Sequence, residues 1–188
     1  GLLGVALPSE LGGSEAGTVA YSLAMQELSA ACASTAVAVA VTNMCAELIS
    51  VYASDEVRRR FVPRLTSGEA VAGAFALSEA HAGSDARGMR TFAERKGDRY
   101  ILNGSKQWIT SGNVAGVMVV WARTTKAASE TDHKGITAFV VEGRSEGLEV
   151  VHRCRFLGIR AIENGLIRFR NVKVPAENVI LGEGKGLK

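Results

Sequence analysis

Two short stretches of this 188-residue chain combine hydroxyl, acidic and aromatic side chains in a way that suits ligand binding. The first, residues 75–85, reads FALSEAHAGSD, so that an apolar strand runs directly into a loop of small, hydroxyl and acidic residues. Such a loop exposes backbone N–H groups and hydroxyls at a strand end, where they can recognise a polar ligand. A purely structural alternative also stays open, in which Ser84 or Asp85 caps a short turn.

The second stretch, residues 106–112, reads KQWITSG. If residues 106–110 form a strand, Trp108 and Thr110 face the same side of it, because side chains alternate along a strand. A flat indole beside a hydroxyl donor suits a flat heteroaromatic cofactor. A strand tryptophan is also a common core residue, and for this segment alone that alternative stays open.

Helices are expected to come first in the chain and strands afterwards. The pattern predicts helices over residues 19–31 and 35–52, the latter capped by Ser34, and a third helix that starts at Ser54 and ends by residues 66–68. Short strands punctuated by glycine follow, at 71–77, 99–102, 106–110, 116–123, 136–142, 148–152 and 166–170. Asn103-Gly104 between two of these strands predicts a two-residue hairpin turn.

These elements predict an α+β fold, with an all-α N-terminal segment followed by a β-barrel or two-sheet antiparallel domain. The expected organisation is a partial helical domain over residues 1–68, a β-domain over 69–182, and the start of a linker at 183–188. No alternation of strands with helices is visible, so a Rossmann fold is not supported.

Composition narrows the class of partner. A hydrophobic content of 47% with 22% charged residues is typical of a globular protein, and a net charge of +3 is too small to indicate nucleic acid. The three cysteines and three histidines are scattered, so neither disulfides nor a metal site is expected. The most apolar stretch, residues 30–53, contains Asn43 and Glu47, which favours a buried helix over a membrane span. We therefore expect a reducing compartment, the cytoplasm of a bacterium or the mitochondrial matrix of a eukaryote, rather than secretion.

Taken together, the two stretches resemble the acyl-CoA dehydrogenase family. FALSEAHAGSD and NGSKQWITSG occur in family order with GLLGVALPSELGG before them and with GITAFVVEG, LGIR and VPAENVILGEGKGLK after them. The resemblance covers essentially the whole chain, while the chain covers roughly half of a typical member. It implies FAD as cofactor and oxidation of an acyl-CoA thioester to a trans-2-enoyl-CoA. The expected partners are the acyl-CoA substrate and an electron-transferring flavoprotein, and the expected assembly is a homodimer or homotetramer.

The resemblance also implies the roles of particular residues. Ser78 and Thr110 supply hydroxyls near the flavin ring, Trp108 packs at its edge, and Ser84 also contacts the substrate. The cofactor-binding residues implied are Phe75, Leu77, Ser78, Gly83, Ser84, Trp108, Ile109 and Thr110. The substrate-binding residues implied are Ser84, His133 and Lys134.

The chain departs from the family pattern in three places. Ala80 and His81 stand where relatives often have Pro and then Gly or Asn, and residues 161–165 read AIENG where relatives usually carry a Ser and a Thr. The catalytic glutamate of relatives belongs to a C-terminal helical domain, and neither Glu163 nor Glu183 matches its motif. The resemblance therefore assigns no catalytic residue to these positions. Other flavin chemistry on the same fold (an acyl-CoA oxidase, a nitroalkane oxidase or a flavin monooxygenase) and a non-catalytic module remain alternatives.

Overall fold

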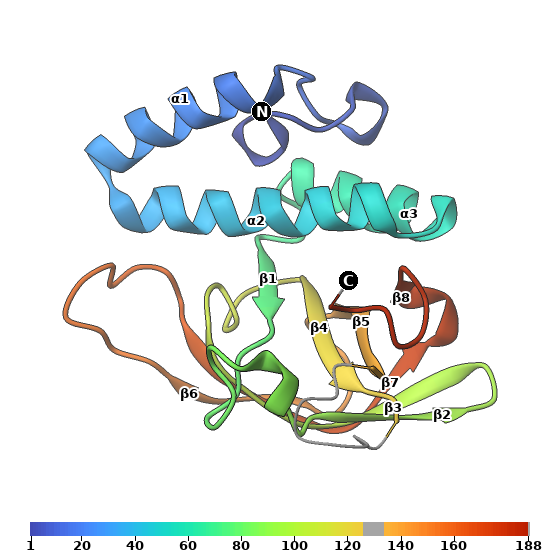
Figure 1. The fold of residues 1–188 in the computed structure, drawn as a ribbon. Coiled ribbons are helices and arrows are strands. Elements are labelled where there is room, and N and C mark those ends of the chain that lie inside the picture. Colours follow the sequence, from blue (N-terminus) through green and yellow to red (C-terminus); the bar gives the residue numbers. More distant parts are fainter. Residues whose placement is uncertain (126–133, 188) are drawn as a thin grey trace.

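A layer of helices covers one face of a curved sheet in the computed structural model, which describes residues 1–125 and 134–187 (Figure 1). The helices are α1 (Gly17–Ala31), α2 (Ala33–Tyr52) and α3 (Asp55–Thr66), with short 3-10 helices η1 (Leu2–Gly4), η2 (Ser9–Leu11), η3 (Ala86–Gly88) and η4 (Ala176–Asn178). The strands are β1 (Gly73–Ala76), β2 (Phe92–Lys96), β3 (Arg99–Ile109), β4 (Val117–Arg123), β5 (Ile136–Glu142), β6 (Leu148–Arg153), β7 (Gly165–Pro175) and β8 (Val179–Ile180). The α+β class predicted from the sequence is confirmed.

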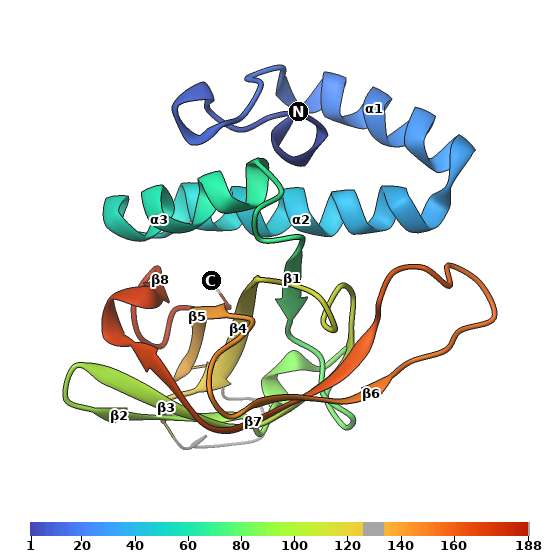
Figure 2. The ribbon, with the colours of Figure 1, turned by 180° about the vertical axis from the view of Figure 1, so that it is seen from behind.

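The strands of the described residues form one hydrogen-bonded sheet in the order β6-β7-β3-β2-β4-β5-β8, with β1 added beside β4. Most neighbours are antiparallel, as expected, but β1 and β2 each pair with β4 in parallel. The sheet is therefore mixed rather than antiparallel throughout. Seen from behind, β1 leads the chain out of the helical layer and down into the sheet (Figure 2).

The central strands separate two hydrophobic cores. Every residue of β4 is buried, and its side chains enter the two cores alternately. Val119 and Trp121 join the core beneath the helices, whereas Val120 and Ala122 join the core enclosed by the curved sheet. Burial of both faces explains why this strand is a continuous apolar run, without the polar alternation of a half-exposed strand.

Part of the apolar surface of helix α2 packs into the hydrophobic core beneath the helices. It is the one helix in the described ranges that is long and apolar enough to cross a membrane by length and composition. Cys45, Ala46 and Ile49 on this helix are fully buried in the core that α3 and the sheet complete. Core packing therefore accounts for the buried stripe of this helix.

The observed ends of the helices agree with most of the sequence prediction, but the N-cap of α2 differs from the predicted one. The Ser54 hydroxyl accepts a hydrogen bond from the Val57 N–H at 3.4 Å and caps α3. Ser34 was expected to cap α2, but that prediction is wrong, because the extended residue before the helix is Cys32 and Ser34 lies within the first turn. Its hydroxyl instead accepts a hydrogen bond from the Ala161 N–H at 3.4 Å, from the loop between β6 and β7.

The hairpin expected at Asn103-Gly104 is also a wrong prediction, because β3 continues through this pair without turning. The pairing of β3 with β7 shifts register between Leu102 and Gly104, where Asn103 alone lies opposite two residues of β7, so the extra residue of this bulge belongs to β7. Gly104 has φ +147°, and a Cβ at this position would clash with Thr91. The turn between β2 and β3 is at Gly97 instead, where φ is +62°. At both places glycine adopts a positive φ that other residues seldom adopt, but the chain reverses only at Gly97.

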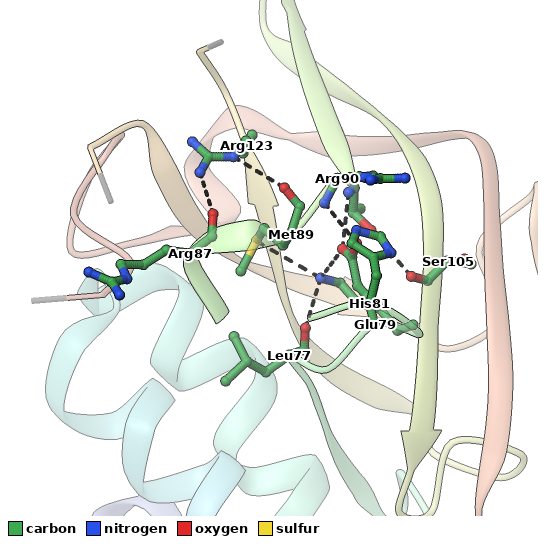
Figure 3. A network of polar contacts seen from close by, with 10 residues as sticks. Leu77, Glu79, His81, Arg87, Met89, Arg90, Ser105 and Arg123 are labelled. Carbon is green, nitrogen blue, oxygen red and sulfur yellow. Dashed lines mark hydrogen bonds and ion pairs between the residues drawn. The ribbon is translucent and has the colours of Figure 1, made fainter. Parts of the chain in front are cut away.

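A buried ion pair fastens the end of β1 to β3. The Lys106 ammonium donates to Glu79 Oε1 at 2.7 Å and to the Leu77 carbonyl at 3.0 Å, and it lies 4.0 Å from Met89 Sδ. Both side chains are buried, that of Lys106 completely (0% exposed) and that of Glu79 at 3%. Figure 3 shows Leu77 and Glu79, from the segment after β1, beside Met89, from the loop before β2.

The C-terminal residues lie on the sheet. The Tyr100 hydroxyl donates to Glu183 Oε2 at 2.7 Å, the Trp121 indole donates to the Gly186 carbonyl at 2.7 Å, and the Gly184 N–H donates to Thr137 Oγ1 at 2.9 Å. Residues 183–187 are thus held between the helical layer and β5, where both views place the C-terminus (Figures 1 and 2). Their role as the start of a linker stays a prediction.

We expect Gly104→Ala to destabilise the protein much more than Gly97→Ala. A Cβ on Gly104 would lie 2.7 Å from Thr91 Cα, whereas one on Gly97 would meet no atom within 4 Å. Both changes place alanine at positive φ, but only the first adds a backbone clash, so we expect losses of about 3 kcal/mol and about 1 kcal/mol in the free energy of unfolding. Urea denaturation of the two variants measures the difference, and equal losses would contradict the close approach of Gly104 to Thr91.

Removing either partner of the buried ion pair is expected to cost about 3–5 kcal/mol in the free energy of unfolding, because the other charge stays buried without its partner. Lys106→Met and Glu79→Gln test this singly, and the double variant should lose clearly less than the sum. Glu94→Gln is the matched control, since Glu94 pairs with Lys96 at 3.3 Å on the surface and should lose at most about 1 kcal/mol. Additive losses in the double variant would show that the pair is not coupled.

Candidate cofactor site

The two stretches singled out in the sequence lie side by side. The Gln107 N–H donates to the Ser78 carbonyl at 2.9 Å, so the residues that follow β1 run against the end of β3. One position away on each segment, Lys106 contacts both Leu77 and Glu79. Backbone and side-chain contacts thus join residues 77–79 to residues 106–107 within one wall of the β-domain.

Trp108 stands out from this wall. Trp108 is 57% exposed. The next residue, Ile109, is 1% exposed and lies in the core enclosed by the curved sheet. A register shift between Lys106 and Ile109 interrupts the regular strand, and Trp108 has φ +59°. The exposure excludes the interpretation of Trp108 as a core residue. The strand alternation that was used to place Trp108 and Thr110 on one side does not hold across this bulge.

The two hydroxyls predicted to face a cofactor are available to a ligand. Ser78 and Thr110 are both half-buried. Within the part of the chain that the structure describes, their hydroxyls make no hydrogen bond to another protein group. Each hydroxyl can therefore donate one hydrogen bond and accept others.

Glu79 organises the loop that follows β1. Its Oε2 accepts a hydrogen bond from the Arg90 N–H at 2.7 Å and its Oε1 accepts one from the Thr91 N–H at 3.0 Å, besides the bond from Lys106. His81 Nε2 lies 3.5 Å from Glu79 Oε2 (Figure 3). The Arg123 guanidinium also holds this loop by donating to the carbonyls of Met89 and Arg87.

The charges of the ion pair suit a structural role. Burial raises the pKa of the Glu79 carboxyl, but the Lys106 ammonium and the hydrogen bonds from Thr91 and Arg90 outweigh it, so that the pKa lies below its usual range. Burial lowers the pKa of Lys106, and attraction to Glu79 offsets part of that effect. Glu79 is thus ionised at neutral pH and engaged by its donors, which makes it a poor proton acceptor for a reaction.

The remaining predicted residues are spread more widely. Gly83 and Ser84 lie in the exposed loop after Glu79. Phe75 packs against Trp121 in the core beneath the helices, with ring centroids 4.3 Å apart, and Ile109 lies in the other core. Lys134 is exposed in the turn before β5, and His133 lies outside the described residues. Contacts of all these residues with cofactor or substrate stay predictions.

Three residues that sequence reasoning did not select complete the wall. Lys106 and Glu79 were seen only as parts of the two stretches, because their pairing joins residues 27 positions apart. Asn164 donates from Nδ2 to the Trp108 carbonyl at 2.9 Å, and it comes from the loop before β7. Only the departure of residues 161–165 from the family pattern pointed to that loop.

Comparison with known proteins matches both parts of the fold. Residues 1–69 match the family model "Acyl-CoA dehydrogenase, N-terminal domain" and residues 74–172 match "Acyl-CoA dehydrogenase, middle domain". Among curated relatives, the chain is 41% identical to a cyclohex-1-ene-1-carbonyl-CoA dehydrogenase of Geobacter metallireducens, over 99% of this chain and 48% of the relative. It is 40% identical to a mitochondrial isovaleryl-CoA dehydrogenase of Arabidopsis thaliana, over 99% of this chain and 45% of the relative.

Solved structures agree with the fold. A butyryl-CoA dehydrogenase from Megasphaera elsdenii matches with a TM-score of 0.92 and 36% identity, over 99% of this chain and 49% of that one. A glutaryl-CoA dehydrogenase from Mycobacterium smegmatis in complex with FADH2 matches with a TM-score of 0.86 and 36% identity, over 100% and 46%. A chain in the structure of the electron transferring flavoprotein of Acidaminococcus fermentans matches with a TM-score of 0.92 and 34% identity, over 99% and 48%.

The chain spans about half the length of the curated relatives it matches. The three α-helices lie within the residues that the N-terminal model matches, and most of the sheet lies within the residues that the middle-domain model matches. These 188 residues belong to the acyl-CoA dehydrogenase family.

Proposed function

We propose that the protein containing this chain binds FAD and oxidises an acyl-CoA thioester to a trans-2-enoyl-CoA. The observation that carries the proposal is the junction of residues 77–79 with residues 106–110, where an exposed indole stands beside two segments that carry unengaged hydroxyls. Relatives support it, because a short-chain specific acyl-CoA dehydrogenase, an isovaleryl-CoA dehydrogenase and a cyclohex-1-ene-1-carbonyl-CoA dehydrogenase are 36–41% identical to this chain.

The residues at the junction fit a flavin. A flat indole that is 57% exposed offers a surface for a planar ring system, and hydroxyl donors suit the polar edge of such a ring. Open space adjoins Gly83 in the neighbouring loop, since a Cβ there would meet nothing within 4 Å. The glutaryl-CoA dehydrogenase of Mycobacterium smegmatis that shares this fold was solved in complex with FADH2.

Each residue has a distinct task in the proposed site. When bound, the flavin supplies the electron acceptor of the reaction. Trp108 packs at the edge of the ring and excludes water, while the hydroxyls of Ser78 and Thr110 orient it by hydrogen bonds. Ser84, His133 and Lys134 contact the acyl-CoA. The buried pair of Lys106 and Glu79 holds the two segments at fixed spacing, which keeps the reacting groups in register.

The base that removes the α-proton is proposed to lie outside these residues. Glu163 forms an ion pair with Arg153, and Glu183 accepts a hydrogen bond from Tyr100. Glu79 is engaged in the buried ion pair. Within the described residues these carboxylates have structural partners, which supports a base supplied by the part of the protein that the relatives contain and this chain does not span.

Electrons are proposed to pass to an electron-transferring flavoprotein, as the match to a chain in the Acidaminococcus fermentans structure suggests. A second candidate is an oxidase, in which O₂ accepts the electrons. A prolyl acyl carrier protein oxidase, AnaB, shares the fold with a TM-score of 0.89 and 28% identity. The fold alone does not separate the two acceptors.

In the complete protein, anaerobic addition of one member of a panel of acyl-CoA thioesters is expected to bleach a yellow flavin spectrum. Bleaching by a thioester identifies both the reaction class and the preferred acyl group. Admission of air then separates the candidates, since slow reoxidation favours the dehydrogenase and fast reoxidation favours the oxidase. A flavin spectrum that no thioester changes would contradict the proposed reaction.

Thr110→Val tests the hydroxyl in the same assay. We expect bleaching about tenfold slower or more, because the change removes one hydrogen-bond donor and keeps the side-chain shape. Thr18→Val is the matched control, since Thr18 is an exposed residue on α1 away from the junction. Equal rates in Thr110→Val and the wild type would remove Thr110 from the site.

Residues 1–188 alone are expected to bind FAD weakly and to leave acyl-CoA unchanged, because the base and much of the contact with the flavin nucleotide are proposed to lie elsewhere in the protein. Purification of this fragment and quantification of bound flavin measure the first expectation, and an anaerobic assay with the thioester that bleaches the complete protein measures the second. Stoichiometric flavin in the purified fragment would contradict this assignment.

A further inference from the structure

The backbone of the segment that carries Trp108 is unusual. Trp108 has φ +59° and Ser111 has φ +60°, a region that residues other than glycine seldom adopt. In the facing loop before β7, Glu163 has φ +48°. Such conformations persist when surrounding contacts hold them, and they gather at ligand sites. Contacts with another part of the protein are therefore expected to hold the segment from Trp108 to Asn113.

The loop of residues 162–164 provides that support. The Ile162 carbonyl accepts a hydrogen bond from the Ser111 N–H at 2.9 Å, and the Glu163 carbonyl accepts one from the Asn113 N–H at 3.3 Å. The Asn113 side chain donates from Nδ2 to the Asn164 carbonyl at 3.2 Å. These contacts fix residues 111–113, beyond the tryptophan.

A side-chain amide fixes Trp108 itself. Asn164 Nδ2 donates to the Trp108 carbonyl at 2.9 Å, and Asn164 is 5% exposed. The backbone carbonyl of Asn164 accepts a hydrogen bond from the Cys154 N–H at 2.8 Å, which anchors this part of the loop to the end of β6. The Asn164 Oδ1 atom is buried and has no partner among the described residues. Among the described residues, the Asn164 side chain therefore acts as a hydrogen-bond donor through Nδ2 and not as an acceptor.

We propose that Asn164 is a positioning residue for the flavin site: its amide holds the peptide of Trp108 so that the indole and the Thr110 hydroxyl are presented together. This inference rests on the proposed function, in which Trp108 and Thr110 contact FAD. Asn164 touches neither substrate nor cofactor and acts through the Trp108 carbonyl. The bulge places the indole on the surface, and the Asn164 amide stabilises the positive φ of Trp108.

Asn164→Asp in the complete protein tests the inference, because it keeps the shape of the side chain and replaces the donor by an acceptor facing a carbonyl. We expect about tenfold weaker FAD binding, the scale of one hydrogen bond. The visible absorption maximum of the bound flavin should shift, and amide hydrogen exchange should accelerate about tenfold across residues 108–113. Asn164→Ala removes the donor without adding charge and decides the result if the aspartate variant does not fold.

Asn178→Asp is the matched control. Asn178 is 2% exposed, donates from Nδ2 to the Val140 carbonyl at 2.9 Å, and has a buried Oδ1 without a partner among the described residues. It should lose stability without changing the flavin spectrum or exchange at residues 108–113. Equal flavin effects in the Asn164 and Asn178 variants would reduce Asn164 to a general structural role and overturn the inference.

The outcomes also separate this inference from the proposed function. If the wild-type complete protein binds no flavin, the proposed function fails, and faster exchange confined to residues 108–113 in Asn164→Asp still supports Asn164 as the support of Trp108. If the wild type binds flavin and both Asn164 variants retain its spectrum, its affinity and the wild-type exchange, the inference is wrong while the proposed function stands.

Discussion

The buried pair of Lys106 and Glu79 is the constraint on which the candidate site depends. A charged group inside a protein is tolerated only when its hydrogen bonds are complete. The Lys106 ammonium meets Glu79, the Leu77 carbonyl and the Met89 sulfur, and the Glu79 carboxylate also receives two backbone N–H groups. Completing these bonds fixes three separate segments to one another. The end of β1, the loop before β2 and the end of β3 therefore form one rigid wall.

The apolar layers set where this wall can form. Strand β4 is buried on both faces, so it keeps the helices on one side and the closed inner core on the other. Strand β1 must then cross from the helical layer into the sheet beside β4, which brings its polar continuation to the end of β3. At that end the bulge turns Trp108 out of the sheet instead of into the core. The exposed indole is thus a consequence of strand irregularity, and the loop before β7 holds it.

Local patterns in the sequence predicted the helices, most strands and the two polar stretches, because these depend on residues close together in the chain. The failures came from contacts between distant residues. Asn103-Gly104 has the composition of a turn, but pairing with β7 and the close approach to Thr91 keep it within a continuous strand. Strand alternation could not place Trp108, since the register shift depends on the partner strand. Asn164 was invisible to local reasoning, because its role is a hydrogen bond to a residue 56 positions away.

A crystal structure of the complete protein would show where FAD lies. We predict that the flavin ring lies against the wall of residues 77–79 and 106–110, with the Trp108 indole at its edge and the hydroxyls of Ser78 and Thr110 within hydrogen-bond distance, about 3 Å. The Lys106–Glu79 pair should be unchanged behind it. A flavin bound at another face, with Trp108 in solvent and both hydroxyls apart from it, would contradict the account.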